Sequence, residues 1–155
     1  MAMKFTDALD RKMEDVKRPP NPPVGHYTWQ VKKHPDTDSF ESKNSGKTFD
    51  RLEFSMACVA PSDDVDPDDL AEYGDVTGFL TRKSFLFDNE DEQAFERSMY
   101  NLKRFFEHLG VDESLSVSEA LAACIGAQCL GELKHRPDPN DPEVVYAELG
   151  RTAAL

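Results

Sequence analysis

Hydrophobic and polar residues alternate with a period of two along five segments of the chain, which predicts five β-strands. The clearest alternation lies at residues 48–59. One face of that strand would carry Leu52, Phe54, Met56 and Cys58. The other predicted strands cover residues 24–33, 76–87, 127–136 and 143–149. Polar connections rich in turn-forming residues separate the first three strands, and we expect them to be loops.

Three further segments carry apolar residues at the three- and four-residue spacing of amphipathic helices. The longest pattern covers residues 91–109, and a shorter one at residues 116–124 begins with serine and glutamate at the spacing of a capping box. Residues 4–18 predict a third helix. The segment 19–23 that follows has four prolines in five residues and predicts a stiff extended linker.

The predicted order of elements is a helix, three strands, a helix pair and two strands, which indicates an α+β fold. Three strands, a helix and two strands is the order of the OB-fold, a five-stranded Greek-key barrel. Other α+β arrangements share this order. On this interpretation residues 1–18 form an N-terminal amphipathic helix, residues 19–23 a proline-rich linker, and residues 24–150 an OB-fold domain with the helix pair between strands three and four.

The charge of the chain is strongly negative but unevenly distributed. Thirty acidic residues stand against 18 basic ones, for a net charge of −12. Half of the acids lie within residues 63–75, 88–96 and 138–143, whereas the predicted strands are neutral or basic. The balance excludes a simple polycation that coats nucleic acid, but it allows a local basic surface. The acidic loop at residues 62–75 is a solvated face, a mimic of DNA or a barrier to duplex DNA.

Composition also indicates the cellular compartment in which the protein acts. Three cysteines favour a reducing environment over a disulfide framework. We see no apolar stretch of a secretory signal near residue 1 and no run of about 20 apolar residues that would cross a membrane. We therefore expect a cytoplasmic protein, in the host cytoplasm if the chain is encoded by a phage.

Motifs that would indicate an enzyme are missing from the sequence. It contains no phosphate-binding loop, zinc-protease helix, nucleophile elbow or dinucleotide fingerprint. The four histidines are scattered, and Cys124 and Cys129 lack the paired spacing of a zinc site. Aspartates from Asp64 onward resemble a calcium loop, but Asp69 replaces its glycine. The sequence predicts no catalytic residue, no metal and no cofactor.

Residues 22–31, PPVGHYTWQV, resemble the P-x-G-x-Y first strand of bacteriophage-type single-stranded-DNA-binding proteins with an OB-fold. The glycine-containing loop at residues 45–47 and the F-F-x-x-L-G pattern at 105–110 leading to 126–130 are also similar to that family. The resemblance spans roughly residues 20–150. It implies a barrel that sequesters single-stranded DNA during replication or recombination, with other replication or recombination proteins as partners. Residues 150–155 lack the acidic tail usual in bacterial proteins of this function, so recruitment through such a tail is not expected.

Single strands are bound by a basic groove with aromatic faces on which bases stack. In an OB-fold this site lies on strands two and three and the loops beside them. The candidate residues of these types are Trp29, Lys32, Lys33, Lys43, Lys47, Phe49, Arg51, Arg82, Lys83, Phe85, Lys134 and Arg136. Trp29 lies on the same strand side as Tyr27 and Val31, which favours the core over base stacking. Phe85 fits either side, because a one-residue slip exchanges the faces of a strand.

A protein-interaction module on the same barrel is the alternative function. Its docking surface would be the acidic loop at residues 62–75 or the N-terminal helix. Salt-dependent binding to oligonucleotides would separate the two functions. The sequence leaves a homo-oligomer open in either case.

Overall fold

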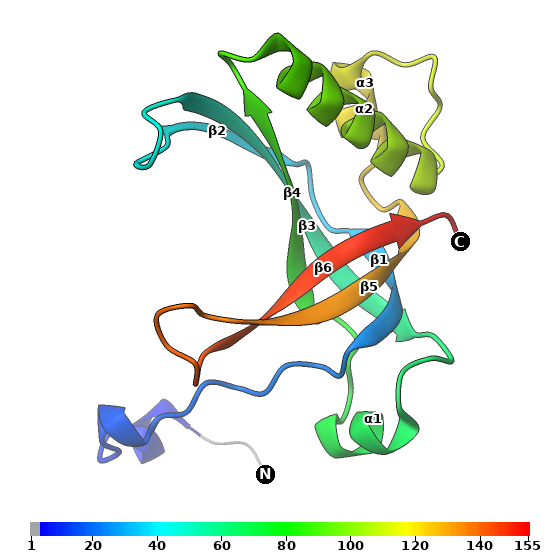
Figure 1. The fold of residues 1–155 in the computed structure, drawn as a ribbon. Helices are drawn as coiled ribbons and strands as arrows, with labels where there is room; N and C mark the ends of the chain where they lie inside the picture. Colours follow the sequence, from blue (N-terminus) through cyan, green and yellow to red (C-terminus); the bar gives the residue numbers. More distant parts are fainter. Residues whose placement is uncertain (1–3) are drawn as a thin grey trace.

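Six antiparallel strands form one sheet in the computed structural model, which describes residues 4–155 (Figure 1). The strands are β1 (Gly25–Val31), β2 (Asp36–Glu41), β3 (Thr48–Pro61), β4 (Leu80–Asp88), β5 (Gln128–Pro137) and β6 (Val145–Ala153). Along the sheet the order is β2-β3-β1-β5-β6, and β4 pairs with the other edge of β3. Together with the helices this confirms the α+β class.

Helices α2 (Glu92–His108) and α3 (Val117–Ala123) lie where the hydrophobic spacing and the caps predict them. A short helix, α1 (Pro67–Tyr73), lies within the acidic segment that was expected to be a loop. The Asp91 carboxylate accepts a hydrogen bond from the N–H of Ala94 at the start of α2. Both hydrogen bonds of the predicted capping box, between Ser116 and Glu119, are present at α3. These caps satisfy N–H groups that a helix leaves without partners in its first turn.

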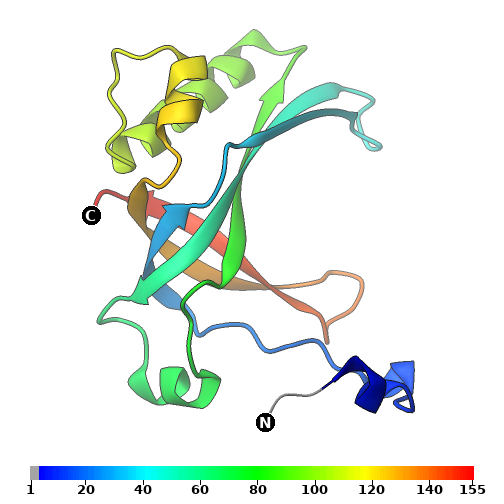
Figure 2. The same ribbon diagram turned by 180° about the vertical axis from the view of Figure 1, so that it is seen from behind.

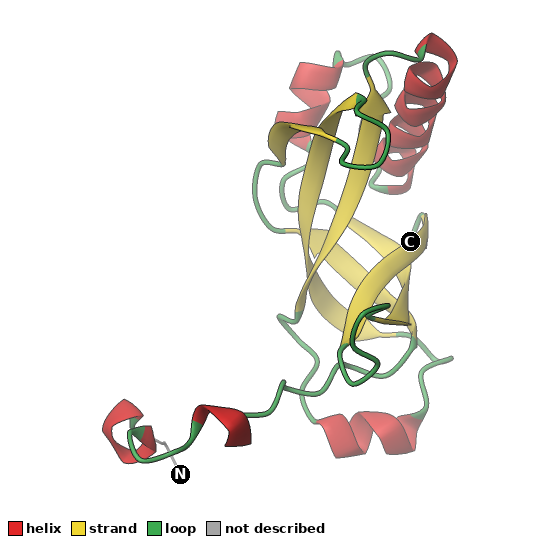
Figure 3. Cartoon of the chain, turned by 60° about the vertical axis from the view of Figure 1, so that its left-hand side comes forward, coloured by secondary structure: helices red, strands yellow, loops and turns green. Residues whose placement is uncertain are grey.

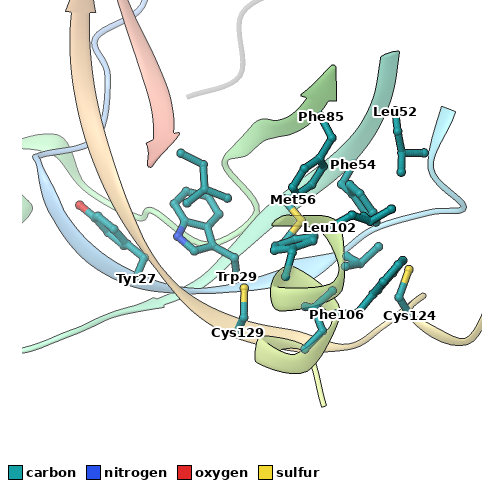
Figure 4. Close-up of a cluster of buried hydrophobic side chains, with 14 of the residues drawn as sticks. Tyr27, Trp29, Leu52, Phe54, Met56, Phe85, Leu102, Phe106, Cys124 and Cys129 are labelled. Carbon is teal, nitrogen blue, oxygen red and sulfur yellow. The ribbon is translucent and has the colours of Figure 1, made fainter. Parts of the chain in front are cut away.

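The core lies between the inner face of the sheet and α2 (Figure 4). The predicted apolar face of β3 is buried as expected. The Phe54 ring packs edge-on against Phe105 of α2, with 4.9 Å between ring centroids, and against Phe85 of β4 at 5.8 Å. Because α2 presents its apolar side to β3 and β4, the opposite face of these two strands stays open to solvent (Figure 2).

Strand β2 replaces part of the loop expected at residues 35–48. Its residues are almost all exposed, so they lack the apolar alternation by which the other strands are recognised. The strand forms because the chain turns back at Gly46 and pairs residues 36–41 with residues 48–53 of β3. Strand β3 therefore pairs with β2 and then with β1 along one edge, and with β4 along the other.

The N-terminal helix predicted for residues 4–18 is wrong as a continuous α-helix. The described part of this segment forms two short 3₁₀ turns at Phe5–Ala8 and Met13–Asp15, and neither contains a buried residue. An isolated helix of this length is marginally stable in water unless its apolar side packs on another surface. The segment packs on none here (Figure 3), and the prediction for residues 1–3 lies outside the described residues.

Backbone pairing does not close the sheet into the expected barrel, since no such pairing joins β4 to β6 within residues 4–155. The two strands are linked by side chains instead. The hydroxyl of Thr81 donates to the carbonyl of Ala147 at 3.3 Å, and the Lys83 ammonium donates to the carbonyl of Gly150 at 3.0 Å. The sheet thus curls until its ends meet through side chains.

Acid should weaken the fold. Hydrogen bonds from Arg51 and His26 lower the pKa of Asp38 and Asp64 from the usual 3.8, and a backbone N–H of Glu90 lowers that of Asp88. A carboxyl whose pKa is lower in the folded state stabilises the fold above its unfolded pKa, and the effect is lost as the pH falls through the folded pKa. We expect the thermal midpoint to stay level between about pH 5 and 7 and to fall below about pH 4.

Circular dichroism melts from pH 7 to pH 2.5 would measure this loss, with Asp64→Asn as the matched variant. The variant has one fewer carboxyl group whose pKa is lowered in the folded state. Its thermal midpoint should therefore fall less between pH 5 and pH 2.5 than that of the parent chain. A midpoint that is the same at pH 3 and pH 6 would show that these hydrogen bonds contribute nothing to stability.

Candidate nucleic-acid interface

Two aromatic rings stack on the outward face of the sheet, where β2 pairs with β3. Phe40 lies directly opposite Phe49, and their ring centroids are 5.7 Å apart with 20° between the planes. Both side chains are partly exposed. The Arg51 guanidinium lies over the Phe40 ring, 5.4 Å from its centroid. Stacked rings beside a guanidinium offer flat surfaces that suit an unpaired base.

Phe40 is absent from the residues that the sequence predicted for the site. The sequence does not indicate Phe40 because the polar composition of residues 35–48 predicts a loop. A usable signal was present, since Ser-Phe-Glu at 39–41 and Thr-Phe-Asp at 48–50 flank the turn at Gly46 symmetrically. Two such triplets around a glycine turn are typical of a hairpin, and they place the two phenylalanines across from each other.

Arg51 is held by an acidic neighbour on β2. Its Nε and Nη2 donate to the two carboxylate oxygens of Asp38 at 3.0 and 2.6 Å. This bidentate pair raises the pKa of Arg51 and lowers that of Asp38. A phosphate that binds Arg51 must therefore compete with the Asp38 carboxylate, or be added on the remaining N–H groups.

Most of the other predicted basic residues are also paired with acids. The pairs are Lys33 with Asp36 at 3.1 Å, Lys47 with Asp88 at 3.3 Å, Arg82 with Glu53 at 3.5 Å, Lys134 with Glu132 at 3.2 Å, and Arg136 with Glu148 at 3.2 Å. Lys32 and Lys43 are exposed and form no ion pair within residues 4–155. Ion pairs between exposed side chains contribute about 0–1 kcal/mol, so a phosphate can replace the carboxylate at small cost, except at Lys47, whose partner Asp88 is buried.

A groove of about 730 Å³ continues the outward face toward the β5–β6 hairpin. It runs between the proline-rich linker, β4 and the start of β6, and Arg82, Arg136 and Tyr146 are among the residues that line it. The Tyr146 ring has two guanidinium groups over it, Arg18 at 4.8 Å and Arg136 at 5.7 Å from its centroid. Its hydroxyl donates to Asp138 at 2.9 Å, which fixes the ring.

The linker is attached to this wall of the groove. The amide of Asn21 donates to the carbonyl of Val145 at 2.7 Å, and Nε2 of His135 lies 2.6 Å from the carbonyl oxygen of Pro22. Arg18 and Tyr146 were not predicted as site residues. Sequence gave no means of finding them, because their proximity depends on how the linker crosses the hairpin.

Trp29, Phe85 and Lys83 lie away from the accessible face, which corrects their prediction as binding residues. Trp29 is fully buried, and its indole N–H donates to the carbonyl of Gly131 at 3.0 Å. Phe85 is buried on the inner face opposite Leu52. Lys83 also points inward, and burial lowers its pKa. Alternate residues of a strand face opposite sides, so Arg82 is outward whereas Lys83 and Phe85 are not.

The acidic segment at residues 62–75 carries local structural contacts. Asp64 accepts hydrogen bonds from the backbone N–H of His26 at 3.1 Å and lies 2.6 Å from its Nδ1. Asp66 caps α1 by accepting from the N–H groups of Asp68 and Asp69, and Asp75 accepts from Thr77. Three of its acids therefore have roles in holding the segment.

Within residues 4–155 no group of three or more His, Cys, Asp or Glu is arranged to hold a metal ion. Burial raises the pKa of the Cys58 and Cys129 thiols to about 11, so they are neutral at pH 7. None of the helices in the described part of the chain combines the length and the apolar character needed to cross a membrane.

No family model matches this chain, and a search of curated proteins finds no significant match.

Proposed function

We propose that this protein binds single-stranded DNA without sequence preference and protects it during replication or recombination. The proposal includes an OB-type arrangement of β1, β3, β4, β5 and β6. The pairing order β4-β3-β1-β5-β6 supports it, as does the position of α2 and α3 between β4 and β5 in the chain. We expect it to act in the cytoplasm, that of the host if a phage encodes it.

The observation that carries the proposal is the aromatic and guanidinium surface on one continuous face. The stacked pair of Phe40 and Phe49 lies at one end, beside Arg51. Tyr146 lies in the groove at the other end, under Arg18 and Arg136. Figure 1 shows the β2–β3 and β5–β6 hairpins projecting on the same side of the sheet, with β3 and β4 between them.

A strand that crosses this face would meet stacking surfaces at both ends and cations between them. Arg82 lies on the outward face of β4, opposite Ser55 of β3, within the groove. A base can stack on any aromatic ring, so such a surface reads no sequence. Duplex DNA keeps its bases stacked inside, and it would gain only the phosphate contacts.

The ion pairs along the face set the expected strength of binding. Arg51, Arg82 and Arg136 already have a carboxylate nearby, so their gain on binding a phosphate is smaller than for a free arginine. The rest of the molecule is acidic and repels DNA. Single strands should therefore bind with moderate affinity and only through this face.

A titration with an oligothymidylate of about 30 nucleotides at several salt concentrations tests the proposal. Counterion release predicts a dissociation constant that rises steeply with salt, by about 0.7 log units per phosphate contact for each tenfold change in salt. A duplex of the same length should bind much more weakly. Equal binding to duplex, or no binding at low salt, would remove the proposed function and favour the protein-interaction alternative.

Removing the acid that holds Arg51 should strengthen binding. In Asp38→Asn the guanidinium keeps a neutral neighbour and is released for a phosphate, and the chain loses one negative charge. We expect the dissociation constant for oligothymidylate at low salt to fall by about 3- to 10-fold, which corresponds to one added charge-assisted contact of about 1 kcal/mol.

Glu107→Gln is the matched control for this variant, since it also removes one negative charge but frees Arg104 of α2, which is not among the candidate binding residues. An equal gain in both variants would mean that net charge alone sets affinity. Unchanged or weaker binding in Asp38→Asn would show that Arg51 does not touch the DNA.

A further inference from the structure

The N-terminal arm, residues 4–18, exposes an apolar stripe that no other described part of the chain covers. Phe5, Leu9, Met13 and Val16 are 82%, 63%, 87% and 52% exposed. Their spacing of four, four and three residues places them on one side of an α-helix. Clustered exposed apolar side chains on a monomer mark an interaction surface. The arm therefore has the sequence of an amphipathic helix that lacks its docking surface.

A groove of matching character lies between α2 and α3. It has a volume of about 390 Å³, its floor includes Phe106 and Leu102, and Met99, Leu115 and Val117 line its sides. Tyr100, at the edge of this groove, is 60% exposed although it is a large aromatic residue. Grooves of this kind accept the apolar face of a helix.

The arm is attached too far from this groove to fill it as a helix in the same molecule. Arg18 is held over Tyr146 at the start of β6, whereas α2 contacts the end of β6 through a hydrogen bond between His108 and Thr152. The six residues from Tyr146 to Thr152 span about 20 Å of strand, and the groove lies beyond them. Residues 5–16 as a helix are only about 18 Å long. Figures 1 and 3 show the arm and α2 at opposite ends of the molecule.

We infer that the arm of one copy of this chain folds as a helix in the α2–α3 groove of a second copy. The two surfaces differ and lie at opposite ends, so the contact is heterologous and each added copy leaves one arm and one groove open. Successive copies would then form an open chain. Such a chain would align neighbouring copies along a single strand of DNA.

Charge favours the arm over the rest of the molecule as the occupant. The residues that line the groove include four acids, Glu96, Glu107, Asp112 and Glu113, and one base, Lys103. Residues 4–17 carry four basic and four acidic side chains, whereas the whole chain has a net charge of −12. Because its charges balance, the arm is an apolar surface that the acidic residues around the groove do not repel.

Sedimentation velocity of the full chain without DNA tests the inference separately from DNA binding. The weight-average mass should increase with concentration up to several hundred micromolar and pass the dimer value without a plateau. An arm variant, Phe5→Ser with Leu9→Ser, and a groove variant, Tyr100→Ser with Val117→Ser, should each remain monomeric. All four positions are exposed, so these changes should leave the fold intact.

Mixing the two variants gives the decisive result. The arm variant keeps a working groove and the groove variant keeps a working arm, so an equimolar mixture should form a dimer and stop there. A control with Ile125→Ser and Leu155→Ser, which are exposed outside both surfaces, should assemble like the parent chain. A parent chain that stays monomeric, or a mixture that stays monomeric while the parent assembles, would overturn the inference.

Discussion

Replacing Phe40 and Phe49 together by alanine is expected to weaken binding to oligothymidylate by about 30-fold or more. A base stacked on an aromatic side chain contributes about 1–3 kcal/mol, and two lost stacks of about 1 kcal/mol each give roughly that factor. The two rings lie on the outward face of a hairpin, beyond the core. The variant should therefore keep its fold and lose mainly affinity.

The measurement is the same salt-series titration, with a thermal melt to show that the variant is folded. Ile125→Ala serves as the control, since it removes an exposed apolar side chain from the turn between α3 and β5, away from the outward face of β3. It should bind oligothymidylate like the parent chain. If the double variant binds within about threefold of the parent chain, the stacked pair is not part of the binding surface.

Much of the fold could be predicted because its strands and helices bury one face. Strand β3 alternates between residues 52 and 56, since each second residue enters the core, and α2 repeats its apolar residues for the same reason. Strand β2 could not be found in this way. It extends beyond the core and is held by backbone pairing to β3, which leaves no mark in its hydrophobic pattern.

The N-terminal segment shows the opposite error. Phe5, Leu9, Met13 and Val16 have helical spacing, but spacing measures only what a segment can bury when a surface is available. Within one described copy of the chain they remain exposed. The spacing indicates an amphipathic segment, but it does not decide whether that segment is helical in a single copy of the chain.

The candidate site was predictable in residue type more than in position. Arg51, Arg82 and Phe49 lie on the outward face as expected, because the alternation of β3 and β4 fixes their side. The acidic partners of the cations were not foreseen. Asp38 reaches Arg51 only through the pairing of β2 with β3, which the sequence did not reveal. Charge patterns along a chain do not give pairs across a sheet.

Trp29→Ala is expected to destabilise the protein by about 3–5 kcal/mol, the usual cost of removing a buried tryptophan. The indole is fully buried on β1, where its ring centroid lies 5.7 Å from that of Tyr27. Its environment is fitted to it, because a Cβ on Gly131 would lie 2.9 Å from Cδ1 of Trp29. The carbonyl of Gly131 would also lose the hydrogen bond from the indole N–H.

Urea unfolding followed by circular dichroism would measure this loss, since the variant has no tryptophan to follow by fluorescence. Trp29→Phe keeps an aromatic ring and loses the hydrogen bond, so it should cost less and remain measurable if the alanine variant does not fold. In the parent chain the single tryptophan should emit at short wavelength, and its emission should change little when oligothymidylate binds. A loss below about 1 kcal/mol in the alanine variant, together with strong quenching by DNA, would place the indole at the binding surface, because a residue buried as Trp29 is here cannot be removed so cheaply.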